Sequence, residues 1–239
     1  MYQWYTLVFW SKAVSDNVPF ETIAIKAFHA LDLFNKLPSE YRPNYLKVKR
    51  LRDAKPFSFT YENFYDELQK GINKEGKRVF GDLGYNVSFF SSLNKSSCVG
   101  YSIQVGCTNK RFINTFIIDF PVSFPANTSS YGKEIKEIFL KVIDLLDPFW
   151  AGFVNDAFPQ DTGGFPKGEE RKITSVHWLN YWGKEMLNQL DRKKLAAISI
   201  KFPQVTYSKG FLQMQELALD INNDKDVAYK REIEKYLLS

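Results

Sequence analysis

Three short runs of β-branched and aromatic residues in the middle of the chain constrain its fold more than any other feature. They occupy residues 85–90, 100–107 and 114–120, and Gly, Asn, Ser or Pro residues bound each of them. Runs of this length and composition between turn-forming residues are typical of β-strands. Because the connections are too short for a crossover helix, we expect neighbouring strands to run antiparallel.

Apolar residues at helical spacing predict helices on both sides of this region. One stripe runs from Phe20 to Phe34 and another occupies 132–146, so each segment can bury one face. The other predicted elements are strands at 1–10, 45–51, 150–155, 174–181, 197–202 and 204–207, and helices at 60–73, 184–190, 211–221 and 224–238.

These patterns together predict an α+β fold in which a mainly antiparallel sheet is flanked by helices. With 239 residues, the chain has the size of one large domain, 1–239. Its halves share a coarse order of strands and helices. This order leaves open two related lobes, 1–125 and 126–239, within that domain.

The charge and cysteine content of the chain narrow the classes of protein to which it can belong. A net charge of +5 permits an acidic partner or nucleic acid. The one local concentration of basic residues, 47–52, fits a charged strand edge better than a nucleic-acid patch. Cys98 and Cys107 lack the spacing of a disulfide scaffold or a zinc site. No basic leader or long apolar run is present, so we expect a cytoplasmic protein without cofactor, metal or membrane partner.

Two local patterns suggest catalysis but lack the context that it needs. Asp161-Thr162-Gly163 spells the triplet of aspartic proteases, whose chemistry requires two carboxylates that share a proton. The chain holds no second triplet, so we interpret this one as a turn. The two histidines, His29 and His177, have no nucleophile signature beside them. We expect His29 to be exposed on its helix and His177 to be hydrogen-bonded in a strand.

A long segment with neither a strand nor a helix pattern, 159–172, lies between two aromatic runs. Those runs hold Trp150, Trp178 and Trp182, whereas Gly, Pro and charged residues dominate the segment itself. Such a composition is typical of a surface loop. We interpret it as a loop that is displayed for recognition by a partner.

The aromatic and strand-like segments of the chain, taken in order, carry a family resemblance. They are Phe9-Trp10 and residues 31–34, 85–90, 102–106, 114–121, 147–150 and 176–181. Their order resembles the immunity protein 52 family of bacterial polymorphic-toxin systems. The resemblance covers nearly the whole chain.

This resemblance implies a cytoplasmic protein that is not an enzyme and that binds and neutralises a cognate toxin. For this family the toxin is a nuclease with a restriction-endonuclease-like fold. The resemblance supplies no catalytic residues, and we interpret five residues in and beside the displayed loop as toxin-binding: Phe158, Asp161, Phe165, Lys167 and Arg171. An inhibitor that fills the basic groove of a nuclease is normally acidic. The charge of +5 therefore favours binding away from that groove, or a toxin of another class.

Two other classes of function remain open on the sequence alone. The basic charge and the many aromatic rings would also suit a nucleic-acid-binding protein. A hydrolase whose catalytic groups are dispersed in sequence and meet only in the fold is the second alternative.

Replacing Phe165 and Arg171 together with Ala should leave the fold intact and weaken toxin binding by roughly tenfold or more, because aromatic and Arg side chains carry much of the energy of an interface. Calorimetric titration of the toxin into wild type and variant measures this change. An unchanged affinity would remove the loop from the binding site.

Overall fold

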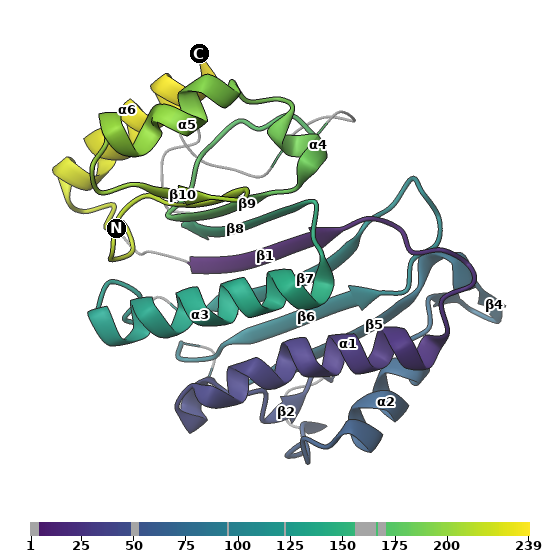
Figure 1. The fold of residues 1–239 in the computed structure, drawn as a ribbon. Coiled ribbons are helices and arrows are strands. Elements are labelled where there is room, and N and C mark those ends of the chain that lie inside the picture. Colours follow the sequence, from purple (N-terminus) through teal and green to yellow (C-terminus); the bar gives the residue numbers. More distant parts are fainter. Residues whose placement is uncertain (1–4, 49–52, 95, 122, 156–165, 167–170) are drawn as a thin grey trace.

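A nine-stranded antiparallel sheet organises the protein. In the computed structural model, which describes residues 5–48, 53–94, 96–121, 123–155, 166 and 171–239, the strand order is β10-β11-β9-β8-β1-β7-β6-β5-β2 (Figure 1). Every neighbouring pair runs antiparallel. The predicted α+β class with a mainly antiparallel sheet is therefore confirmed.

The bounds of the elements are as follows. The strands of the large sheet are β1 Tyr5–Ser11, β2 Tyr45–Leu46, β5 Tyr85–Phe90, β6 Gly100–Val105, β7 Asn114–Phe120, β8 Trp150–Asn155, β9 Leu179–Trp182, β10 Thr206–Ser208 and β11 Phe211–Gln213; β3 Lys74–Glu75 and β4 Arg78–Val79 form a separate hairpin. The helices are α1 Phe20–Asp32, α2 Tyr61–Lys70, α3 Ser129–Leu146, α4 Lys184–Leu187, α5 Arg192–Lys201 and α6 Asp224–Leu238, with 3-10 turns η1 Leu33–Lys36, η2 Ser39–Tyr41 and η4 Gly81–Leu83.

The first strand of the chain lies in the interior of the sheet. β1 pairs with β7 on one side and with β8 on the other. The strands β2, β5, β6 and β7 come from residues 1–125, whereas β8 to β11 come from 126–239. Because β1 joins these two groups, strands from both parts of the chain share one continuous hydrogen-bonded sheet.

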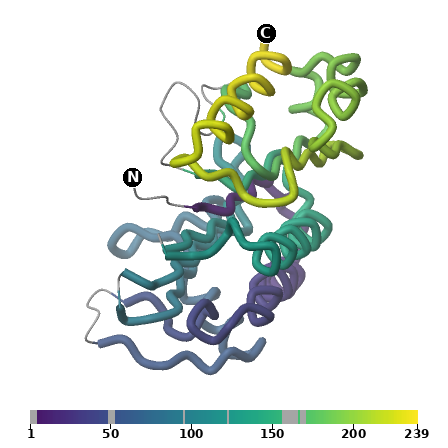
Figure 2. Tube along the Cα trace, turned by 90° about the vertical axis from the view of Figure 1, so that its left-hand side faces the viewer, coloured from purple at the N-terminus to yellow at the C-terminus, as the bar shows by residue number. Residues whose placement is uncertain are grey.

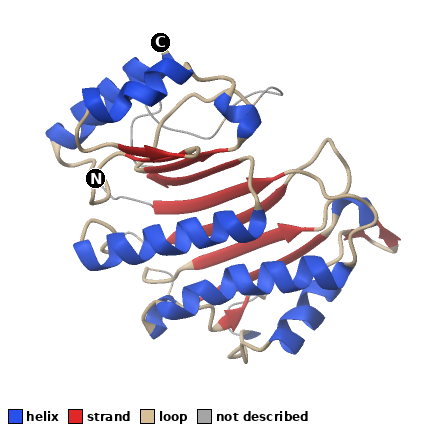
Figure 3. Ribbon diagram, in the orientation of Figure 1, coloured by secondary structure: helices blue, strands red, loops and turns tan. Residues whose placement is uncertain are grey.

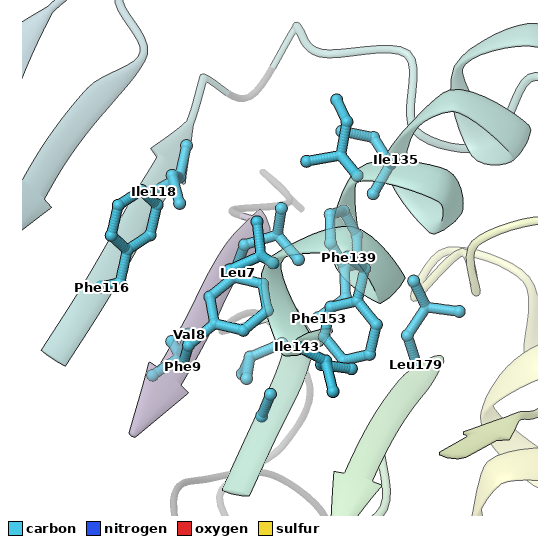
Figure 4. Close-up of a cluster of buried hydrophobic side chains, with 14 of the residues drawn as sticks. Leu7, Val8, Phe9, Phe116, Ile118, Ile135, Phe139, Ile143, Phe153 and Leu179 are labelled. Carbon is cyan, nitrogen blue, oxygen red and sulfur yellow. The ribbon is translucent and has the colours of Figure 1, made fainter. Parts of the chain in front are cut away.

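One face of the sheet carries the main hydrophobic core. Leu7 and Phe9 of β1 point to the same face as Phe116 of β7, and the Phe9 ring lies 5.3 Å from Phe139 of α3 between ring centroids (Figure 4). α1 and α3 lie together on this side (Figure 2). α2 reaches the same face through Phe64, because its ring stacks on a residue of β5.

A second layer covers the opposite face at the β8–β11 end. There α5 and α6 lie on the side of the sheet away from α3 (Figures 1 and 3). Trp150 and Trp182 pair across β8 and β9 and are almost completely buried. Since every residue of β8 is buried, this part of the sheet is covered on both faces.

Local chemistry explains why the predicted strand at 197–202 is wrong. The segment belongs to α5, whose N-cap residue Asp191 accepts hydrogen bonds from two backbone N–H groups of the first turn. Such a cap stabilises a helix start. Leu195 and Ile198 are buried one turn apart, whereas Ile200 is 84% exposed. The β-branched side chain of Ile200 is typical of a strand, but it does not face the core.

The helix predicted at 211–221 is also wrong, because Phe211–Gln213 form β11, which pairs with β9, and residues 214–221 are not helical. Gly210 adopts a φ of +87° in the turn before β11, a conformation that favours glycine. The predicted strand at 204–207 is observed as β10, shifted towards the C-terminus, and that at 174–181 is a strand only from Leu179. Within the described part of 45–51, only Tyr45–Leu46 is a strand.

A buried ion pair holds α6 against the segment that precedes β9. The Lys230 ammonium donates to a Glu234 carboxylate oxygen one turn away, and it also donates to the Ser175 hydroxyl over 3.0 Å. The same carboxylate oxygen accepts from the Ser175 hydroxyl (2.6 Å) and from the Val176 backbone N–H (2.8 Å). This network satisfies buried polar groups of the irregular segment before β9.

Replacing Lys230 with Met should lower the free energy of unfolding by about 3 kcal/mol or more, because the Glu234 carboxylate would stay buried without its cation. Chemical denaturation measures the loss. The matched control is Lys225→Met on the exposed part of the same helix, where the change should stay within about 0.5 kcal/mol. Equal effects of the two substitutions would contradict a stabilising role for the pair.

Candidate interaction surface

One part of the sheet has a face that no helix of the described chain covers. We define the open sheet face as the residues of β5, β6 and β7 that point away from α1 and α3 and that are at least partly exposed: Asn86, Ser88, Gly100, Ser102, Gln104, Thr115, Ile117 and Asp119. The strand register places them in adjacent rows. One row runs from Ser88 through Ser102 to Ile117.

The alternating sequence of these strands explains why this face stays open. Along β6, Tyr101 and Ile103 are buried, whereas Ser102 and Gln104 between them are partly exposed. Side chains alternate between the two faces of a strand, and a polar face can remain in water. The ring contacts of η1 and α2 with β5 to β7 all use residues of the buried face.

An aromatic border closes the open sheet face on the β1 side. Trp10 pairs with Thr115 on one side and with Trp150 on the other. Its ring lies 4.9 Å from the Trp150 ring and 6.3 Å from that of Phe149, measured between centroids. Trp150 is buried, whereas Trp10 is only partly covered. Trp10 therefore lies between the covered and the open part of this sheet face. Large aromatic side chains of this kind are enriched in interfaces.

Arg171 extends this border. Its guanidinium lies 4.7 Å from the centroid of the Phe149 ring, a distance at which a cation and an aromatic face attract each other. The residue adopts a φ of +50° and is partly exposed. Of the five residues predicted to bind a toxin, Arg171 is the one that lies in the described part of the chain. It contacts the Phe149 ring, which Trp10 also contacts.

The other predicted toxin-binding residues lie outside the described residues. They are Phe158, Asp161, Phe165 and Lys167. The prediction that these residues bind a toxin therefore stays a prediction.

Asp119 supplies the one acidic group of the open sheet face. Its carboxylate accepts a hydrogen bond from the Thr6 hydroxyl over 3.0 Å. Burial nevertheless raises the pKa of Asp119 above its ordinary value, because the loss of water around the carboxyl outweighs the hydroxyl and the nearby charge of Lys47. The open sheet face thus combines hydroxyl and amide groups with one carboxyl whose pKa is raised.

The two histidines occupy different environments. His29 is exposed on α1, as predicted. His177 is buried, but it lies just before β9 rather than in a strand. Its backbone N–H donates to Asn180 Oδ1 over 2.8 Å, and its ring lies 6.1 Å from that of Trp150. It therefore packs within the layer that covers β8.

The Ser175 and Lys230 side chains lie as close together as a catalytic nucleophile and its base, but Lys230 cannot act as a base here. Lys230 donates to both Ser175 and Glu234, and an ammonium engaged with a carboxylate has no lone pair to accept the serine proton. The adjoining cavity has a volume of about 10 Å³, the size of a single water. These residues stabilise the fold in the arrangement that the structure shows.

The described residues contain no group of three or more His, Cys, Asp and Glu side chains that could hold a metal ion. None of their helices has the length and hydropathy of a transmembrane segment.

Comparison with known proteins gives a likeness of fold. No protein-family model matches the chain, and no curated protein matches its sequence. Among solved structures, the Pseudomonas aeruginosa T6SS protein PA0821 superposes with a TM-score of 0.59 at 12% sequence identity. The match covers 98% of this chain and 73% of that protein. The chain therefore shares its fold with a T6SS protein from a bacterium.

Sequence reasoning missed the open sheet face, although a signal was present. The polar residues that alternate with apolar ones in 100–105 and 114–119 show that each strand has one polar face. That the faces of three strands form one uncovered surface depends on where the helices pack. The composition of the displayed loop is locally unusual, and the sequence therefore indicates the loop rather than the sheet face as the binding site.

Replacing Asp119 with Asn should stabilise the protein relative to wild type by an amount that grows with pH. The raised pKa means that the folded protein binds this proton more tightly than the unfolded chain. Wild type therefore loses stability as pH rises from the ordinary value of 3.8 through the folded value, and the variant does not. Urea denaturation of both proteins between about pH 3 and pH 7 measures the difference. A difference that shrinks as pH rises would contradict this account.

Proposed function

We propose that this protein is an immunity protein that binds and neutralises a cognate bacterial toxin through the open sheet face. The observation that carries the proposal is this uncovered three-stranded surface with Trp10 and Arg171 at its border. In antiparallel sheets, an apolar face usually packs on a core and a polar face is usually exposed to water. Here small hydroxyl and amide side chains make a flat surface that a partner can approach closely.

The size of the surface indicates how far the interface extends. Strands about 4.8 Å apart and roughly 20 Å long give three strands an area of about 300 Å². A standard interface covers about 800 Å² on each partner. The partner must therefore also contact the border, where Trp10 and Phe149 offer aromatic surface and Arg171 a cation.

The charge of the open sheet face bears on how the toxin is bound. Apart from Asp119, the face consists of neutral residues, and Lys47 lies near that carboxyl. A surface of this kind does not mimic the dense negative charge of nucleic acid. We therefore propose that a nuclease-type toxin is bound away from its substrate groove, and that access to substrate or a movement of the toxin is blocked.

The fold likeness to a bacterial T6SS protein is consistent with a secretion-related role of this kind. The resemblance of the sequence to immunity proteins points to the same setting. The nuclease character of the toxin rests on that resemblance alone.

The test is co-expression of this protein with the toxin domain encoded by the adjacent reading frame in a bacterial host. Ser102→Arg with Gln104→Arg places two long cations on the open sheet face, and we expect loss of protection and a fall in affinity of about a hundredfold. The matched control is Ser130→Arg with Ser199→Arg, which adds the same charge at exposed positions of α3 and α5. The control should protect as wild type does.

Three results would contradict the proposal. The first is an adjacent gene set with metabolic functions and no toxin. The second is full protection by the open-face variant, provided that circular dichroism shows both variants to be folded. The third is equal loss of protection in the control, which would show that added charge and not the surface is responsible.

A further inference from the structure

A second surface feature lies on the helix-covered side of the sheet. It is a cleft of about 160 Å³ between the first turns of α1, the last turn of α3 and the ends of β1, β6 and β7. Phe9, Phe116 and Ile23 contribute to its apolar lining, and Lys26 of α1 also lines it. The cleft therefore combines an apolar interior with a cationic group.

The cleft exists because small residues line α1 and the turn after β6. Ala27, which lines it, is fully buried. Gly106 has a φ of +74°, and a Cβ there would lie 3.1 Å from the Tyr85 ring and 3.4 Å from Ile23 Cδ1. A larger residue at either position would push into the space. The opening is thus a property of the packed helix and turn.

Two of the neutral polar side chains that line the cleft, Ser11 and Asn114, form hydrogen bonds within the protein. The Ser11 hydroxyl donates to the Leu146 carbonyl over 3.0 Å. Asn114 Nδ2 donates to the Lys12 carbonyl over 2.6 Å, and Asn114 Oδ1 accepts from the Cys107 backbone N–H over 2.8 Å. No ion pair of the described residues involves Lys26, which is exposed. The ammonium of Lys26 is therefore available to a ligand.

Volume and charge together select a class of ligand. A cavity of about 150 Å³ with an apolar lining is large enough to bind benzene. A lysine ammonium beside such a space favours a ligand with one negative charge next to its apolar group, since ligand sites pair an apolar interior with a few polar groups that fix orientation.

We propose that this cleft binds a small carboxylate that carries one benzene-sized apolar group, with the ring among Phe9, Phe116 and Ile23 and the carboxylate on Lys26. The proposal does not depend on toxin binding, because the ring contacts Phe9, Phe116 and Ile23 lie on the helix-covered side of the sheet, and of the residues that line the cleft only Thr115 also belongs to the open sheet face.

The probe for this test is phenylacetate, titrated into the isotopically labelled protein and followed by methyl NMR. We expect saturable shifts of the Ile23, Val105 and Leu145 methyl signals, with a dissociation constant in the millimolar range or tighter, as is usual for a ligand of this size. Shifts scattered over the surface, or none up to about 20 mM, would overturn the proposal.

Variants separate the two parts of the site. Lys26→Met should weaken phenylacetate binding by roughly tenfold and leave toluene binding unchanged, because only the carboxylate needs the cation. Lys133→Met, an exposed lysine elsewhere on the helical side, is the matched control and should bind as wild type does. Equal phenylacetate affinity in Lys26→Met and wild type would refute the assigned carboxylate contact.

Filling the cleft tests the ring position. Ala27→Leu should abolish binding of both phenylacetate and toluene, because its added carbon atoms occupy the same space. Should this buried substitution prevent folding, Thr22→Phe reaches the cleft from an exposed position of α1 and should have the same effect. Undiminished binding in a folded, filled variant would overturn the proposal.

Discussion

The fold depends on β1, which pairs with two strands from distant parts of the sequence. Its seven residues pair with β7, more than 100 residues later, and six of them also pair with β8, about 140 residues later. Contacts of such sequence separation carry a large loop-closure cost. They are stabilised here by apolar side chains on both faces of the strand, since Leu7, Val8 and Phe9 are all buried.

The two-sided burial of β1 also explains where the open sheet face begins. On the β8 side, His177 packs against Trp150 of β8, and the helices α5 and α6 cover the sheet. Gly152 makes this possible, because a Cβ there would lie 3.1 Å from the Trp150 ring and 3.2 Å from that of His177. On the β7 side the same face carries Thr115, Ile117 and Asp119, and no described helix follows. One strand thus separates a part of the sheet that is covered on both faces from a part that is covered on one.

Periodicity in the sequence predicted the elements whose local pattern agrees with their tertiary role. The strands at 85–90, 100–105 and 114–120 alternate and are half-buried, so the sequence signal and the burial coincide. In α5 the two disagree, because the strand-like side chain of Ile200 faces solvent and the helix start depends on the cap that Asp191 provides. β11 was missed because three residues are too few for a period to show.

The site was harder to predict than the fold for a physical reason. Sequence composition marks a residue as polar or aromatic, but it does not show whether another element covers it. Trp10 and Trp150 have the same residue type and neighbouring positions in the sheet, yet only Trp150 is buried. Arg171 could be proposed from composition, whereas its contact with Phe149 depends on the turn that gives Arg171 its positive φ.

The edges of the sheet favour recognition through its face and not through strand addition. The edge strands β2 and β10 have two and three residues, so each offers few free backbone groups to an added strand. Short edges are a common protection against unwanted pairing. A partner that binds by extending the sheet would gain little here, because strand addition draws its affinity from main-chain hydrogen bonds. The open sheet face offers side chains instead, and side-chain contacts discriminate between partners more strongly than backbone pairing does. The proposed immunity function requires discrimination of this kind, because specificity is a difference between the affinities for two partners.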